Sequence, residues 1–156
     1  MLARIRGNPR PLVAIAIAIA LLMVFFVIVA PLFNTSSAPR AELSGGIPAS
    51  GVVGHQLEID LGLDNTGLSV ISPICILVAV QGAALHPDYA IFQGIDREIV
   101  MGGKVCGGAL NGQDSISIRM FVTPLAAGRA SIALTPAKGG TAVGSAFTGT
   151  IAVVAA

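Results

Sequence analysis

The 156-residue sequence is poor in aromatic residues and in charge, and both shortages limit what the protein can do. It has no tryptophan and a single tyrosine, Tyr89, so it lacks the aromatic platforms on which many proteins stack nucleic-acid bases. Charged residues make up 11% of the chain and hydrophobic residues 54%, a balance that excludes an intrinsically disordered chain. The net charge of +1 is far from the basic surplus typical of nucleic-acid binders. The composition therefore argues against a nucleic-acid partner.

The few charges are unevenly distributed along the chain. Three arginines, Arg4, Arg6 and Arg10, lie within the first eleven residues, and no acidic residue accompanies them. An uninterrupted run of 19 apolar residues follows, from Leu12 to Ala30. As a helix this run is about 28 Å long, close to the hydrocarbon thickness of a bilayer. Because apolar residues occupy every face of that helix, the sequence predicts a transmembrane helix within residues 12–33 rather than an amphipathic surface helix.

The arginines also predict the orientation of this span. Under the positive-inside rule, residues 1–11 form a cytoplasmic basic tail, and the chain beyond about Asn34 is periplasmic or extracellular. A cleaved signal peptide is the main alternative, but its apolar core is usually only about 7–15 residues long. Prolines also follow Ala30 and Ala38, the two candidate cleavage positions. We expect an uncleaved single-pass anchor in the lipid bilayer.

The chain beyond the span changes from a helical to a strand pattern. Residues 34–50 are rich in Ser, Pro, Gly and Ala without any period, which predicts a linker between the membrane and a domain at 51–156. Residues 56–64 alternate between polar and apolar, which predicts a strand with Leu57, Ile59, Leu61 and Leu63 toward a core. The other predicted strands are residues 74–80, 89–92, 98–101, 115–122, 130–134 and 148–154. About seven short strands separated by turn residues indicate an all-β sandwich.

One of these strands has a different pattern. Residues 74–80 are apolar throughout, which is typical of a central strand with both faces covered.

Two turns carry a resemblance to a known fold. One alternating strand ends in the turn residues 64–67, Asp-Asn-Thr-Gly, and residues 123–128 precede a later strand. This pattern resembles the immunoglobulin-like modules of prokaryotic surface proteins over residues 50–154, which implies an immunoglobulin-like sandwich but no functional residues. The sequence departs from that pattern because it lacks a core tryptophan. Its two cysteines are also only 31 residues apart, too close for the usual bridge between sheets.

Cys75 and Cys106 are the only cysteines, and both lie in the part of the chain that is predicted to be outside the cytoplasm. Two cysteines in an oxidising compartment most often pair, so we expect a disulfide between them. In the chain-entropy picture, closing this loop stabilises the fold by roughly 3–4 kcal/mol. A metal site, a redox pair or two unpaired thiols are the alternatives.

Metal ligands are sparse. Copper could draw on His55, His86, Met101 and Met120, but no recognisable ligand spacing brings them together, and methionine is more often a core residue. The acidic stretch at residues 60–65 offers oxygen ligands for calcium in Asp60, Asp64 and Asn65, although a solvated strand face that ends in a turn explains these residues more simply. The sequence predicts no bound metal and no cofactor.

Catalytic signatures are missing from the sequence as well. It contains no G-x-S-x-G elbow, no H-E-x-x-H pair and no phosphate loop, since Gly103 and Lys104 are followed by valine instead of serine or threonine. We therefore expect a protein without enzymatic activity.

The low charge of the outer part suggests a partner instead. From Asn34 onward there are six basic and eight acidic residues, few for a domain that must stay solvated alone. Apolar or small residues cluster at 101–103, 107–110 and 143–149, and an exposed apolar area often marks an interface. We expect a structural or accessory subunit of a larger membrane assembly, which binds other subunits or copies of itself. A pilin-like filament subunit and an extracytoplasmic carrier of a small ligand or copper are the alternatives.

Overall fold

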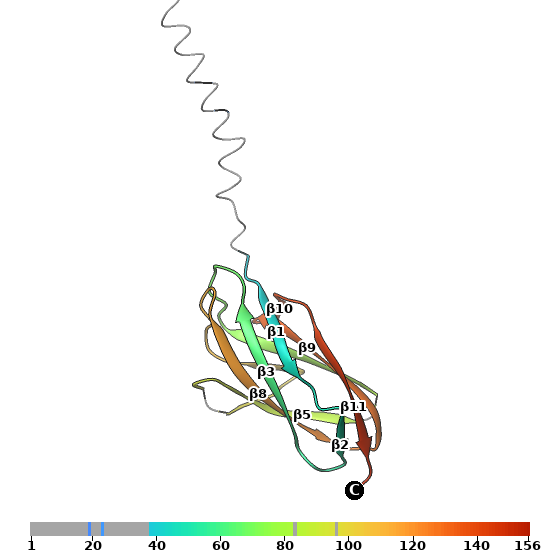
Figure 1. Ribbon diagram of the computed structural model, residues 1–156. Coiled ribbons are helices and arrows are strands. Elements are labelled where there is room, and N and C mark those ends of the chain that lie inside the picture. The colour runs from blue at the N-terminus through green and yellow to red at the C-terminus, as the bar shows by residue number, and fades with distance from the viewer. Residues whose placement is uncertain (1–18, 20–22, 24–37, 83, 96) are drawn as a thin grey trace, which may run out of the picture. The chain divides into compact units, whose positions relative to one another are not determined.

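The computed structural model describes residues 38–82, 84–95 and 97–156, together with Ile19 and Met23 (Figure 1). The chain divides into two compact units, Met1–Ser37 and Ala38–Ala156. In the first unit, Ile19 and Met23 are helical and exposed. Among the residues described, no helix has the length and apolar character needed to cross a membrane. The remainder of the span predicted at 12–33 and the arginines Arg4, Arg6 and Arg10 lie outside the described residues, so the anchor and its orientation stay predictions.

The second unit is an all-β sandwich of two sheets, which confirms the sandwich part of the predicted fold class (Figure 1). Sheet A contains, in spatial order, β1 (Ala41–Gly46), β3 (Leu57–Asn65), β8 (Ser115–Pro124), β5 (Leu85–Phe92) and β6 (Arg97–Ile99). Sheet B contains β2 (Ser50–Val52), β11 (Phe147–Val154), β9 (Gly128–Lys138), β4 (Ile74–Gly82) and β7 (Lys104–Cys106), and β10 (Thr141–Ala142) pairs with β9. All neighbouring strands are antiparallel except β2 and β11, which run parallel.

Seven of the strands are ordered as in an immunoglobulin constant-type sandwich, but the two sheets contain further strands at their edges. β1, β3, β8 and β5 correspond to strands A, B, E and D, and β11, β9 and β4 correspond to G, F and C. The two short strands β6 and β7 extend the far edges of the sheets. The chain crosses between the sheets after β1, so that β2 joins the edge of sheet B beside β11.

The core lies between the sheets and consists of the inward half of each alternating strand. On β3, Ile59 and Leu63 are completely buried and Leu61 nearly so, as the alternation predicts, whereas Leu57 at the strand's start is half-buried. Phe92 is the largest fully buried side chain. Aliphatic residues supply nearly all the rest, which is consistent with a sequence that has few aromatics.

The predicted linker at 34–50 is wrong for most of its length. Residues 41–46 form β1, which pairs with β3 along its whole length, and the side chain of Ala41 is 1% exposed. The domain therefore begins at Ala38. The strand escaped prediction because it is an edge strand without a hydrophobic alternation: only Ala41 is buried, and Gly45 approaches β3 closely. A Cβ on Gly45 would clash with the carbonyl oxygen of Asp60, and its φ of 133° lies in the region that favours glycine.

Asn65 joins the crossover loops between the sheets. Its side chain is buried, and its amide Nδ2 donates to the carbonyl oxygens of Ser69 and Asn111, both at 2.8 Å. Its Oδ1 accepts the backbone N–H of Gly67 at 3.1 Å. Ser69 belongs to the β3–β4 connection and Asn111 to the β7–β8 connection, so one side chain fixes both. The sequence indicates only a turn at Asn65, because these partners are 4 and 46 residues away.

Candidate functional site

The outer face of sheet B carries no charged residue on its central part. Along β4, β9 and β11, alternate residues point away from the core, and opposite residues are paired in register, as Ala79 is with Ala133 and Gln81 with Ser131. The outward residues of these three strands that form the uncharged face are Leu77, Ala79, Gln81, Ser131, Ala133, Thr135, Thr148, Thr150 and Ala152. Charge returns only at the margins, at Lys104 opposite Leu77 and at Arg129 opposite Ala152.

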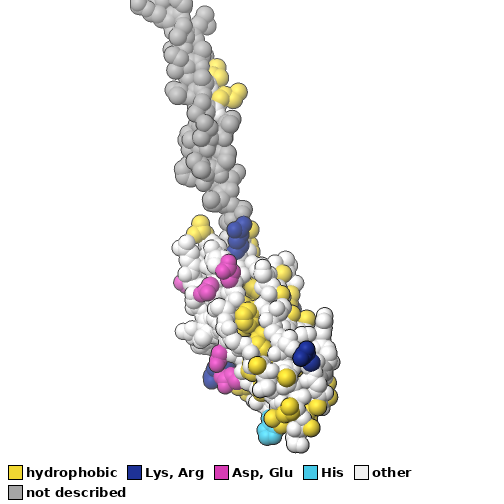
Figure 2. All heavy atoms as spheres, turned by 45° about the vertical axis from the view of Figure 1, so that its right-hand side comes forward, with side chains coloured by type: hydrophobic (Ala, Val, Ile, Leu, Met, Phe, Trp, Pro, Cys, Tyr) yellow, Lys and Arg dark blue, Asp and Glu magenta, His cyan; other side chains and the backbone are white. Residues whose placement is uncertain are grey.

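The uncharged face contains one depression that the structure describes. Ala79, Gln81, Ser131, Ala133 and Thr148 line a shallow depression of about 230 Å³ with no ionisable side chain. Figure 2 turns the right-hand side of Figure 1 forward; mostly hydrophobic or uncharged atoms cover the domain there, with one Lys or Arg side chain at the right and acidic side chains toward the left. The arrangement has the chemistry of a protein contact rather than that of a catalytic cleft.

The outer face of sheet A is built differently. Glu58, Asp60 and Asp64 point outward from β3, and Arg119 lies opposite Asp60 on β8. The Arg119 guanidinium lies 3.6 Å from the Glu58 carboxylate, and both side chains are exposed. This face has the composition of a surface that stays in water.

A polar network occupies one end of that same face. A β-bulge between Pro87 and Tyr89 interrupts the pairing of β5 with β8 at Asp88. The Asp88 carboxylate accepts hydrogen bonds from Gln56 at 2.9 Å and from Thr123 at 2.7 Å, and it lies 2.8 Å from the Nδ1 atom of His86. Burial raises the pKa of Asp88, but the hydrogen bonds from Thr123, Gln56 and His86 outweigh that effect, so the pKa is lowered from its ordinary value.

An aromatic pair lies next to the network. The Tyr89 ring stacks on Phe121 with centroids 4.6 Å apart, and the Arg97 guanidinium lies 3.8 Å above the Tyr89 ring. The Tyr89 hydroxyl donates to the Oε1 atom of Gln56 at 3.3 Å, which connects the pair to the Asp88 network. These contacts tie β3, β8, β5 and β6 together across sheet A.

The network does not have the geometry of a nucleophilic site. The Thr123 hydroxyl donates to Asp88 rather than to His86, so the histidine has no hydroxyl to activate. The network instead holds the bulged strand β5 to its neighbours. The sequence did not predict this network, because Gln56, Asp88 and Thr123 lie on three different strands or connections.

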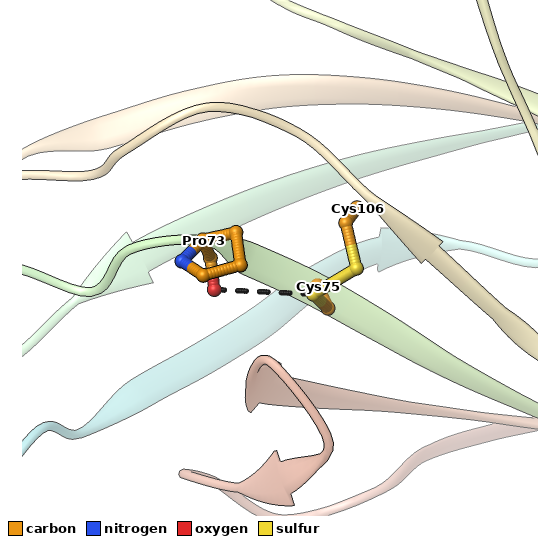
Figure 3. Close-up of a disulfide and its surroundings, with 3 residues drawn as sticks. All are labelled: Pro73, Cys75 and Cys106. Carbon is orange, nitrogen blue, oxygen red and sulfur yellow. Dashed lines mark hydrogen bonds between the residues drawn. A yellow bond between two sulfur atoms is a disulfide. The ribbon is translucent and has the colours of Figure 1, made fainter.

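The predicted disulfide between Cys75 and Cys106 is present (Figure 3). The two residues are directly opposite each other on β4 and β7, with Cα atoms 4.0 Å apart. Cys75 is fully buried beside the carbonyl oxygen of Pro73, and Cys106 is half-buried. The bridge therefore joins neighbours within sheet B instead of joining the two sheets, in agreement with the short separation of 31 residues.

The candidate copper ligands do not come together. Met120 is completely buried in the core, whereas Met101 is 68% exposed on the β6–β7 turn and His55 is exposed between β2 and β3. His86 belongs to the Asp88 network. In the part of the chain that the structure describes, no three His, Cys, Asp or Glu side chains are grouped to hold a metal.

The candidate calcium ligands at 60–65 are separated by the strand's alternation. Asp60 and Asp64 face outward, while Asn65 faces inward with its amide turned to three carbonyl oxygens. Asp64 accepts a hydrogen bond from Ser115.

The apolar segments expected at an interface are only partly exposed. Met101 is exposed, but Leu110 in the second segment is buried in the core, and Phe147 in the third is half-buried. The uncharged face of sheet B was missed instead. The apolar residues 74–80 predict a strand that is covered on both faces, yet Ala79 is exposed. The prediction failed because the outward residues are as apolar as the inward ones, so the sequence shows no alternation.

Comparisons with known proteins support the fold and go no further. No protein-family model and no curated protein matches the sequence. Among solved structures, AvmM, which catalyses macrocyclization in alchivemycin A biosynthesis, superposes with a TM-score of 0.52 at 11% identity, over 76% of this chain and 89% of its own. The CARDB domain of a Pyrococcus furiosus protein superposes with a TM-score of 0.50 at 16% identity, over 75% of this chain and 94% of its own. At such identities the likeness shows a shared β-sandwich fold alone.

Proposed function

We propose that this chain is a non-enzymatic, membrane-anchored accessory subunit whose extracytoplasmic β-sandwich binds another subunit of a membrane assembly through the uncharged face of sheet B. The observation that carries the proposal is the contrast between the two outer faces. The outer face of sheet A bears charged side chains along its strands, whereas on the outer face of sheet B they occur only at the margins, at Lys104 and Arg129.

The contrast matters because charge keeps exposed surfaces solvated and copies of a protein apart. Charged residues are depleted at the centres of protein interfaces, where leaving a charge unpaired and dehydrated costs free energy. Small side chains such as Ala79, Ala133 and Thr148 allow a partner's backbone to approach closely, and they lose little side-chain entropy when they are covered.

The location outside the cytoplasm is supported by the disulfide between Cys75 and Cys106, because structural disulfides are rare in reducing compartments. The apolar run from Leu12 to Ala30, preceded by three arginines, supports the same location by an independent argument from the sequence. Both observations support a location of the sandwich on the outer side of a membrane.

A matched pair of substitutions tests the proposed contact. Ser131 and Ser117 are both exposed residues in the middle of long strands, but Ser131 points outward from sheet B and Ser117 outward from sheet A. Ser131→Glu should release the partner when the tagged full chain is purified in mild detergent, and Ser117→Glu should not. Loss of the partner with both variants, or with neither, would contradict the proposal.

The same purification separates the alternative functions. Helical polymers of this chain alone would favour the filament subunit. A monodisperse monomer that binds copper or a small solute would favour the carrier.

A further inference from the structure

The connection between β3 and β4, residues 66–73 and here called the β3–β4 loop, holds two aliphatic side chains in water. Leu68 is 68% exposed and Val70 47% exposed, while their neighbour Ile71 is fully buried in the core. Scattered exposed aliphatic residues are common, so exposure alone does not mark a site. The way the loop is fixed and its place in the chain are more informative.

Hydrogen bonds and close packing hold the backbone of the β3–β4 loop in place. The buried Asn65 side chain bonds to Ser69 and Gly67, and the N–H of Gly67 also donates to the carbonyl oxygen of Arg40. Gly112 packs so closely beneath Leu68 that an added Cβ would lie 2.3 Å from the Leu68 carbonyl oxygen. Leu68 and Val70 therefore cannot fold back onto the core without breaking these contacts.

The loop lies at the end of the sandwich where the domain begins. The hydrogen bond from Gly67 to Arg40 places the loop beside the first residues of the domain, which starts at Ala38. The apolar run within the predicted span ends at Ala30, and only residues 31–37 separate it from Ala38. Even fully extended, this connection reaches at most about 25–30 Å. The tether is thus much shorter than the linker predicted from sequence, because β1 belongs to the domain.

The charges around this end nearly cancel. Arg40 and Lys138 are opposed by Glu42, Asp64 and Asp114, so the end offers no basic patch for acidic lipids. A contact made here with a bilayer would depend on apolar side chains, and it would respond little to salt.

We propose that the β3–β4 loop inserts Leu68 and Val70 into the interfacial layer of the bilayer that holds the chain. This inference rests on the membrane anchor of the proposed function. The short connection keeps this loop tip within reach of the bilayer surface.

A single-label experiment on the full chain tests the insertion. An environment-sensitive fluorophore is attached to Leu68→Cys in protein with the Cys75–Cys106 bridge intact, and the protein is reconstituted into phosphatidylcholine vesicles. Leu125 is the matched control, because it is also an exposed leucine, at 57%, but lies on the β8–β9 turn at the opposite end of the sandwich. Val70→Cys is a second test position if the first variant folds poorly.

The expected result is at least threefold stronger quenching at position 68 than at 125 by a nitroxide carried on the lipid, unchanged between low and high salt. Equal, weak quenching at both positions in vesicle-bound protein would overturn the insertion while leaving the anchor intact. A blue-shifted label at 68 that the lipid nitroxide does not reach would also overturn it, because a protein partner would then cover the loop. Protein that does not remain with the vesicles would overturn the anchor, and the insertion with it.

Discussion

The two outer faces of the sandwich are made by strands of the same kind, but they differ in what points outward. On sheet A the outward positions hold carboxylates and arginines, a stacked aromatic pair and the Asp88 network. On sheet B they hold alanine, threonine, serine and glutamine, and a disulfide ties the edge strand in place. The fold requires only the inward residues to be apolar, so it leaves the outward ones free to differ. The difference between the two faces is therefore not required by the architecture.

Removing the disulfide, which joins two strands of sheet B, should have the largest effect on stability. The double variant Cys75→Ala and Cys106→Ala frees a loop of about 31 residues in the unfolded chain, which should lower the free energy of unfolding by roughly 3–4 kcal/mol. Denaturant titration of the full chain in detergent measures the loss. Wild-type protein under reducing conditions is the control, and an unchanged midpoint upon full reduction would contradict the stabilising role of the bridge.

Removing the hydrogen bonds of the Asn65 side chain should have the second-largest effect on stability, because they fix two connections between the sheets. Asn65→Asp keeps the shape but replaces a donating amide by a carboxylate that faces carbonyl oxygens, which should lower the free energy of unfolding by about 2–3 kcal/mol. Asn111→Asp makes the same chemical change at an exposed amide that bonds only Asp114 by its side chain. Because the new carboxylate faces that of Asp114 in water, this change should cost only about 0.5–1 kcal/mol. Similar losses of unfolding free energy in the two variants, measured by thermal unfolding, would contradict the stabilising role of the Asn65 hydrogen bonds.

The Asp88 network on sheet A should make the stability of the domain depend on pH in acid. Because the pKa of Asp88 is lower in the folded chain than its ordinary value of 3.8, its contribution to stability is complete above that value and is lost as the pH falls through the lowered pKa. Asp88→Asn should lower the free energy of unfolding by about 1 kcal/mol at neutral pH and weaken the loss of stability in acid. Unfolding curves from pH 7 to pH 2 measure both effects.

Asp60→Asn is the control for that series, because Asp60 is an exposed carboxylate on the same sheet. A stability profile with Asp88→Asn that runs parallel to wild type throughout the acid range would show that the network does not sense pH.

The smallest effect on stability is expected where the two faces are compared directly. Ser131→Glu and Ser117→Glu each introduce a charge at an exposed position, so each should change the free energy of unfolding by less than about 0.5 kcal/mol. Calorimetry of both variants would check that any loss of the partner with Ser131→Glu comes from the interface. A loss of more than 2 kcal/mol with Ser131→Glu alone would show instead that the uncharged face is needed for folding.

The sequence predicted the long strands from their alternation or their apolar run and missed the edge strand β1, which has neither. Ile59 and Leu63 are buried as expected, because a strand with one wet and one dry face must alternate. Strand β1 has no such pattern, since its small residues are placed by pairing with β3 and not by their own hydrophobicity. The uncharged face was not predicted for a different reason: Leu77 and Ala79 are as apolar as their buried neighbours Ile76 and Val78, so the sequence does not distinguish them from core residues.

The sequence by itself determined the sandwich class, the inward half of the main strands and the pairing of its only two cysteines. These depend on local periodicity and composition, which are legible along the chain. Only the tertiary structure decided that residues 41–46 belong to the domain, that Asn65 joins two distant loops, and that the uncharged residues of three strands form one face. Such features arise from contacts between residues far apart in sequence, and no local pattern encodes which strands become neighbours.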